Sequence, residues 1–134
     1  SESTKNAITS IFSKKDKIIF TGFRKDAANI IKGFNIYVFA SHSEGLGTVL
    51  LEAMSSKVPV VVYDNAPMNV LVKDKERGLC AKNLDEISLK ECILELINEP
   101  EKAKIYSQNA FKFVDENFSH KALKEAIKNL LEQK

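Results

Sequence analysis

The most constraining feature of the sequence is a loop with two glycines between an apolar run and a helical pattern. Residues 36–40 are short, apolar and rich in β-branched and aromatic side chains, which predicts a buried strand. Gly45 and Gly47 indicate a tight loop. Residues 48–56 then place apolar side chains at helical spacing, with Thr48 as the candidate N-cap. We therefore expect a strand, a glycine loop and a helix in succession.

Two carboxylates flank this loop. Glu44 lies within it, and Glu52 lies about 6 Å along the helix axis from Thr48, which is roughly the step from a pyrophosphate to its attached ribose. Glycines let backbone N–H groups approach a ligand, and a helix N-terminus favours an anion. A carboxylate accepts two hydroxyl donors and suits a vicinal diol. The pattern favours a diphosphate that carries a hydroxylated group on each side.

Five motifs together resemble a known family. They are Phe-Thr-Gly-Phe at residues 20–23, Glu-Gly-Leu-Gly at 44–47, Glu-Ala-Met at 52–54, Pro-Val-Val at 59–61 and Glu-Asn-Phe-Ser at 116–119. With Gly78, they resemble the donor-binding half of retaining, group 1 glycosyltransferases of the GT-B fold, which carry a Glu-x7-Glu signature on this loop and helix. The resemblance covers residues 17 to 131, nearly the whole chain.

The resemblance implies a site for a nucleotide-diphospho-sugar. The residues expected to bind this donor are Gly22, Phe23, Gly45, Leu46, Gly47, Thr48 and Glu52. Glu52 would hold the ribose diol, and Glu44, the catalytic candidate, would position the sugar. Gly22 and Phe23 would contact the nucleobase, although a strand-ending turn with a core phenylalanine explains them equally well.

The resemblance also implies a reaction for the full-length protein. A hexose would pass, with retained anomeric configuration, from a UDP- or GDP-linked donor to a glycan or lipid acceptor in cell-surface polysaccharide biosynthesis. No cofactor and no metal are expected. His42 is the only histidine in the loop and no Asp-x-Asp lies nearby, so the loop offers no typical metal ligand set.

The sequence departs from the family pattern in two places. The Arg and Lys that hold the donor pyrophosphate have no counterpart before residue 17, because Lys14 and Lys15 lie in the wrong context. We therefore expect residues 1–134 to be one truncated donor domain that lacks the N-terminal acceptor domain and does not transfer sugar alone. Val70 also replaces a Glu that the family often has, which leaves Asp64 and Asn65 as weak candidates for substrate contact.

The remaining patterns predict an α/β fold. Strands are expected at residues 17–22, 36–40, 59–64 and 78–81; helices are expected at 24–33, 48–56, 70–73, 86–99 and 101–117, with a last helix capped by Ser119. Asp85 is the candidate N-cap of the helix at 86–99, and Leu96 and Ile97 belong to the apolar stripe of that helix. This alternation predicts a Rossmann-like parallel sheet flanked by helices on both faces. Ligands of such sheets bind at the carboxyl ends of the strands, where Gly22, residues 41–47 and Asp64 are expected.

Composition excludes several other functions. The 20 Lys and Arg nearly balance the 18 Asp and Glu, so the net charge of +2 gives no reason to expect a nucleic-acid partner.

No apolar run reaches 18 residues and no signal peptide is recognisable, which favours a cytoplasmic protein and leaves open a peripheral contact with the inner face of the membrane. Cys80 and Cys92 lack metal or redox spacing and are expected to be reduced core thiols.

Two other readings remain open. One is a different GT-B-like enzyme, such as a nucleotide-sugar epimerase or a phosphorylase, which product analysis would distinguish. The other is a non-catalytic, doubly wound interaction module, for which nucleotide would cause no change in the loop and helix that carry the two glutamates.

Overall fold

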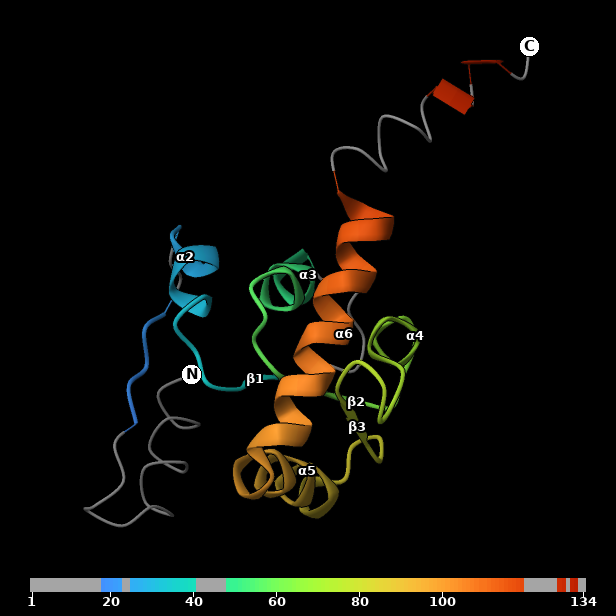
Figure 1. Cartoon of the computed structure of the whole chain (residues 1–134). Coiled ribbons are helices and arrows are strands. Elements are labelled where there is room, and N and C mark those ends of the chain that lie inside the picture. Colours follow the sequence, from blue (N-terminus) through green and yellow to red (C-terminus); the bar gives the residue numbers. More distant parts are fainter. Residues whose placement is uncertain (1–17, 23–24, 41–47, 120–127, 130, 133–134) are drawn as a thin grey trace.

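The computed structural model describes residues 18–22, 25–40, 48–119, 128–129 and 131–132 (Figure 1). Its helices are α2 (Ala27–Ile31), α3 (Thr48–Ser55), α4 (Met68–Val72), α5 (Glu86–Asn98) and α6 (Pro100–Phe118). Its strands are β1 (Tyr37–Phe39), β2 (Val60–Tyr63) and β3 (Leu79–Ala81), paired in the order β1-β2-β3. Both pairings are parallel. The described part therefore has the α/β, Rossmann-like architecture that the alternating pattern predicts.

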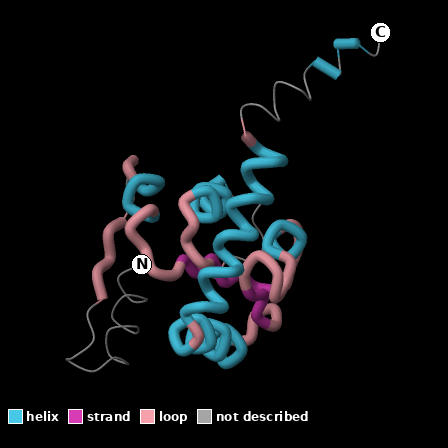
Figure 2. The backbone as a smooth tube through the Cα atoms, viewed as in Figure 1, coloured by secondary structure: helices cyan, strands magenta, loops and turns pink. Residues whose placement is uncertain are grey.

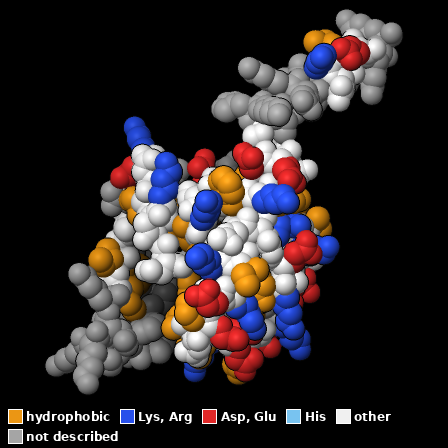
Figure 3. Space-filling view, in the orientation of Figure 1, with side chains coloured by type: hydrophobic (Ala, Val, Ile, Leu, Met, Phe, Trp, Pro, Cys, Tyr) orange, Lys and Arg blue, Asp and Glu red, His pale blue; other side chains and the backbone are white. Residues whose placement is uncertain are grey.

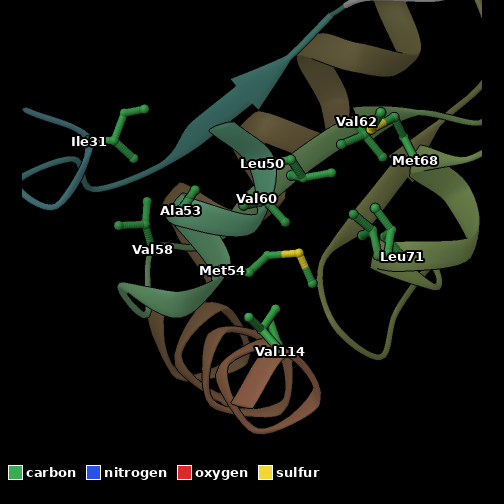
Figure 4. Packing of buried hydrophobic residues seen from close by; sticks show 12 residues of the cluster. Ile31, Leu50, Ala53, Met54, Val58, Val60, Val62, Met68, Leu71 and Val114 are labelled. Carbon is green, nitrogen blue, oxygen red and sulfur yellow. The ribbon is translucent and has the colours of Figure 1, made fainter. Parts of the chain in front are cut away.

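The central strand β2 is buried on both faces of the sheet. Val60 and Val62 belong to one buried cluster with Leu50 of α3 (Figure 4), whereas Val61 belongs to a second cluster with Leu96 of α5. All three valines have no exposed surface. Because successive side chains of a strand point to opposite faces, helices must cover both sides of β2. Figure 2 shows the short strands lying among these helices.

Two helices form as their sequence patterns predict. In α3, Leu50, Ala53 and Met54 are fully buried, which confirms the predicted apolar stripe. In α5, the Asp85 side chain accepts hydrogen bonds from the backbone N–H groups of residues 87 and 88, both at 3.0 Å, which confirms it as the N-cap. The long helix α6 packs across both clusters, with Tyr106 in one and Ala110 in the other.

The strand predicted at residues 17–22 is wrong for its described part. Residues 18–22 form no regular structure, and the sheet of the described residues contains three strands. Ile18, Ile19 and Phe20 are 38, 69 and 42% exposed. A β-branched run becomes a strand only where another strand offers it hydrogen bonds and packing, and sequence alone does not supply that partner.

Smaller corrections concern helix positions and one side chain. The short helix predicted at residues 70–73 begins earlier, at Met68, directly after Pro67. The helix predicted at 24–33 is α2, Ala27–Ile31. Ile97, expected to face inward, is 58% exposed and lines a hollow beside Ile36 and Pro59 near the end of α5. The helix predicted beyond Ser119 lies largely outside the described residues, as do Lys14 and Lys15.

Gly78 lets the chain enter β3 close to β2. Its φ is +155°, and a Cβ added there would lie 2.7 Å from the carbonyl oxygen of Val60 and 2.8 Å from a methyl carbon of Val72. Any larger residue would push β2 or α4 away. The glycine is therefore required by the close approach of two elements.

Candidate functional site

The carboxyl ends of β1 and β2 lie at one edge of the sheet. Phe39 is level with Val62, so the two strands leave the sheet at neighbouring positions. The loop predicted to bind the donor begins just after Ala40, and α3 begins at Thr48. Both ends of this loop are therefore fixed by described structure, at the edge where parallel sheets bind ligands.

Much of the predicted site lies outside the described residues. This holds for Phe23, Glu44, Gly45, Leu46 and Gly47, and for His42 as well. Thr48 is the first residue of α3, so the predicted start of the helix is confirmed, but Thr48 lies within the helix and not at the N-cap position before it. Its side chain is not described. Gly22 and Glu52 are the two predicted donor-binding residues whose surroundings can be examined.

Gly22 and the first turn of α3 lie at the same cavity. This cavity has a volume of about 280 Å³, and its lining residues are Thr21, Gly22, Ile30, Ile31, Phe34, Tyr37 and Val49. Gly22 has a φ of +63°, and no described residue apart from its chain neighbours has an atom within 4 Å of the position that its Cβ would take. The structure thus joins two segments that the sequence separates by more than 20 residues.

The walls of this cavity are apolar and partly aromatic. The rings of Phe34 and Tyr37 are stacked with centroids 6.4 Å apart. Burial raises the pKa of the Tyr37 hydroxyl above its usual value, so this group stays protonated at neutral pH and can donate a hydrogen bond. Apolar and aromatic walls with a few polar groups are typical of sites for planar ligands.

Glu52 lies one turn into α3 and is exposed, off the buried stripe of that helix. Its backbone carbonyl accepts hydrogen bonds from the Ser56 N–H and the Ser55 hydroxyl. Within the described part of the chain, no ion pair involves its carboxylate. This side chain is therefore not held in a salt bridge with any described residue.

A second polar group lies at the ends of β2 and β3. Asp64 and Asn65 follow β2, and their side chains bond to Asn69 and Asn83, respectively. Sequence reasoning named the first two as weak candidates and missed the other two. Asn83 follows the end of β3 and Asn69 lies at the start of α4. These positions near the carboxyl ends of strands could have indicated them from the sequence.

Other features of the described residues do not add a site for chemistry. No three His, Cys, Asp or Glu side chains among them could hold a metal ion together. A hollow of about 470 Å³ opens at the amino ends of the strands, beside Ile36 and Pro59, and none of the predicted site residues lines it. On the face in Figure 3, acidic and basic side chains are intermixed and form no large patch of one sign. Among the described helices, none has the length and apolar character to cross a membrane.

Comparisons with known proteins agree with this geometry. The family model described as "Glycosyl transferases group 1" matches residues 3–113. The chain is 32% identical to the lipopolysaccharide core biosynthesis mannosyltransferase LpcC of Rhizobium leguminosarum. The 104 aligned residues cover 78% of this chain and 30% of that protein. The chain thus spans about 30% of the length of the first curated relatives that it matches.

Two solved structures show the same fold. The C-terminal domain of a group 1 glycosyl transferase, LpcC from Francisella tularensis, superposes with a TM-score of 0.76 at 25% identity, over 89% of this chain and 62% of that one. HepE of Anabaena, crystallised with UDP, superposes with a TM-score of 0.88 at 22% identity, over 99% of this chain and 36% of that one. Because the family model covers most of the chain and the Rhizobium relative is 32% identical over 78% of it, this chain belongs to the group 1 glycosyl transferases, which have the GT-B fold.

Proposed function

We propose that this chain is the donor-binding domain of a retaining glycosyltransferase that moves a hexose from a nucleoside-diphosphate sugar to a glycan or lipid acceptor. The observation that carries the proposal is the cavity shared by Gly22 and Val49 of the first turn of α3. This cavity would take the nucleobase. The diphosphate would then lie at the N-terminus of α3, where backbone N–H groups point outward.

Glu52 fits the role of a ribose ligand in this arrangement. It is exposed and lies about 6 Å along the helix axis from Thr48, at 1.5 Å per residue. Its carboxylate can accept hydrogen bonds from both ribose hydroxyls. Glu44 is proposed to position the sugar on the opposite side of the diphosphate.

The amides at the start of α3 would then assist the reaction. Negative charge develops on the leaving diphosphate as the glycosidic bond breaks, and backbone N–H groups held in place before the reaction stabilise it. This role requires no divalent metal. Retained configuration at the transferred carbon belongs to the same proposal.

The relatives guide the choice of ligand and pathway. HepE was crystallised with UDP, so UDP is the first nucleotide to test, with GDP second. The Rhizobium relative acts in lipopolysaccharide core biosynthesis, which supports a role in cell-surface polysaccharide synthesis. Because the chain spans about 30% of the relatives' length, the acceptor is proposed to bind mainly outside it, and the isolated chain is expected to bind nucleotide without transferring sugar.

A titration with nucleotides tests the proposal. The full-length protein would be titrated calorimetrically with UDP, GDP and ADP, and then again after Glu52→Gln. Loss of the charged acceptor should weaken binding of the preferred nucleotide by about tenfold or more. Glu91→Gln, an exposed glutamate on α5, is the matched control and should change binding by less than about twofold. Absence of binding by all three nucleotides, or equal effects of the two substitutions, would contradict the proposal.

A further inference from the structure

Four polar side chains form a cluster where β2 and β3 end. Asp64 and Asn65 follow β2, Asn83 follows β3, and Asn69 lies in α4. The backbone N–H of Asp64 donates a hydrogen bond of 2.8 Å to the carbonyl of Ala81, the last residue of β3. The cluster therefore lies directly at the carboxyl edge of the sheet.

Side-chain hydrogen bonds connect the cluster. The Asn69 Nδ2 donates to Asp64 Oδ1 at 3.0 Å, and the Asn65 Nδ2 donates to Asn83 Oδ1 at 2.9 Å. The first bond joins the start of α4 to the end of β2, and the second joins the loops after β2 and β3. Because Asp64 is exposed, its carboxylate also remains accessible to a ligand.

One oxygen of this cluster lacks a partner among the described residues. The Oδ1 of Asn69 is buried and accepts no hydrogen bond from any of them. Exchanging the amide's nitrogen and oxygen would not help, because the nitrogen already donates to the carboxylate of Asp64, which cannot donate in return when ionised. Buried polar atoms are nearly always hydrogen-bonded, so an acceptor left without a donor marks a polar cluster that is incomplete without a ligand or water.

The cluster lies beside the proposed donor site. Phe39 of β1 is level with Val62 of β2, and neighbouring strands are about 4.8 Å apart. Met68, which precedes Asn69, belongs to the same buried cluster as Leu50 in the first turn of α3 (Figure 4). A group attached to a diphosphate at the start of α3 would therefore lie close to the ends of β2 and α4.

We propose that Asp64 and Asn69 accept hydrogen bonds from hydroxyl groups of the transferred sugar and so determine which sugar is bound. This inference rests on the proposed function. A carboxylate and an amide oxygen are both acceptors, and sugar hydroxyls are the donors that they lack. A hydroxyl of the wrong configuration leaves the buried oxygen unsatisfied, which is how a polar site rejects a closely related ligand.

The test compares each nucleotide with and without its sugar in the full-length protein. Calorimetry gives the Kd of UDP and GDP and of their glucose, galactose, mannose and N-acetylglucosamine conjugates. The tightest conjugate is then measured with the Asp64→Asn and Asn69→Ala proteins. Each substitution should weaken the conjugate by about tenfold while the bare nucleotide changes by less than about twofold.

Analogues of the donor sharpen the result. Monodeoxy conjugates, each lacking one sugar hydroxyl, should include one for which Asn69→Ala has no further effect, because the substituted contact is already missing. Asn109→Ala is the matched control: its Nδ2 also donates a bond of 2.9 Å, to the carbonyl of Glu76, far from the sheet edge in sequence and fold. This control should leave both ligands unchanged.

The possible outcomes separate this inference from the proposed function. Equal weakening of the bare nucleotide and its conjugate would show a structural role for Asn69 and overturn the inference, as would no weakening of either. In both cases the proposed function stands if Glu52→Gln still weakens nucleotide binding. Absence of nucleotide binding by the unsubstituted protein would overturn both.

Discussion

The guanidinium carbon of Arg77 lies 3.8 Å from the ring centroid of Phe113, which places the charged group over an aromatic ring of α6. The same guanidinium donates hydrogen bonds of 2.7 and 2.8 Å to the carbonyls of Leu71 and Val70 at the end of α4. Its side chain is only 12% exposed. Arg77 thus joins the end of α4 to α6.

Arg77→Lys should destabilise the protein by about 1–3 kcal/mol, because lysine keeps the charge but cannot stack on the ring and donate to two carbonyls together. Chemical denaturation measured by circular dichroism gives this value. Lys104→Ala, an exposed substitution on α6, is the control and should change stability by less than about 0.5 kcal/mol. A loss for Arg77→Lys no greater than that of the control would show that charge alone matters.

Gly78→Ala should lower the free energy of unfolding by about 2–4 kcal/mol. The new methyl group would collide with the backbone of Val60, and the alanine would have to adopt a strained φ. Gly33→Ala is a matched control, because a Cβ there would meet its nearest atom, the Ile30 carbonyl oxygen, at an ordinary 3.6 Å. Thermal denaturation of both variants would decide the point. Similar melting temperatures for the two would contradict the close approach of β2 and β3.

Asp85→Ala should destabilise the protein by about 1 kcal/mol, because the first turn of α5 loses the acceptor of two backbone N–H groups. Asp85→Ser should restore most of the loss, since serine is also a good N-cap. Denaturant titrations of the three proteins measure the difference. If serine were as harmful as alanine, the contribution of Asp85 would be its charge near the helix N-terminus and not the cap.

The two thiols should be unreactive in the folded protein. Burial raises the pKa of Cys80 to about 12, with added repulsion from Asp74 and Asp64, and burial also raises the pKa of Cys92. Little thiolate therefore exists at pH 8, and a disulfide reagent should react much faster after unfolding than before. The absorbance of the released reagent, followed at pH 8 with and without denaturant, gives the two reaction rates. Equal rates would contradict the prediction.

The same shift implies a pH dependence of stability. Above the usual thiol pKa of 9.0, the unfolded chain loses the Cys80 proton while the folded chain keeps it. Because the folded state then binds more protons, stability falls as the pH rises from about 9 to about 12. Cys80→Ala should reduce this part of the decline, which denaturation at pH 8 and pH 10 can measure.

Local patterns predicted the described fold well where one helix or strand contained the whole signal. Asp85 caps α5 because its side chain reaches N–H groups only two and three residues away, which is visible in the sequence. Leu50 and Met54 are buried because their spacing puts them on one side of α3. The strand expected at residues 17–22 was wrong in its described part because strand formation depends on a distant partner. The prediction that Ile97 faces inward was wrong because the pattern identifies an apolar position but does not show whether another element covers it.

The candidate site was predictable in part for the same reasons. The position of Glu52 on the outside of α3 follows from helical spacing and is confirmed by its exposure. The roles of Gly22 and Glu52 stay predictions, and Glu44 lies outside the described residues. Asn69 and Asn83 could not be chosen from the sequence, because their importance depends on contacts between α4 and two strand ends.

The three valines of β2 are fully buried, on one or the other face of the sheet, and this limits how proteins of this fold can vary. A polar side chain at any of these positions would be buried without a hydrogen-bond partner and would destabilise the fold. Substitutions are therefore tolerated best beyond the strand ends, where side chains are exposed to solvent. Residues at the carboxyl ends of the strands can therefore differ between proteins that keep the same buried sheet.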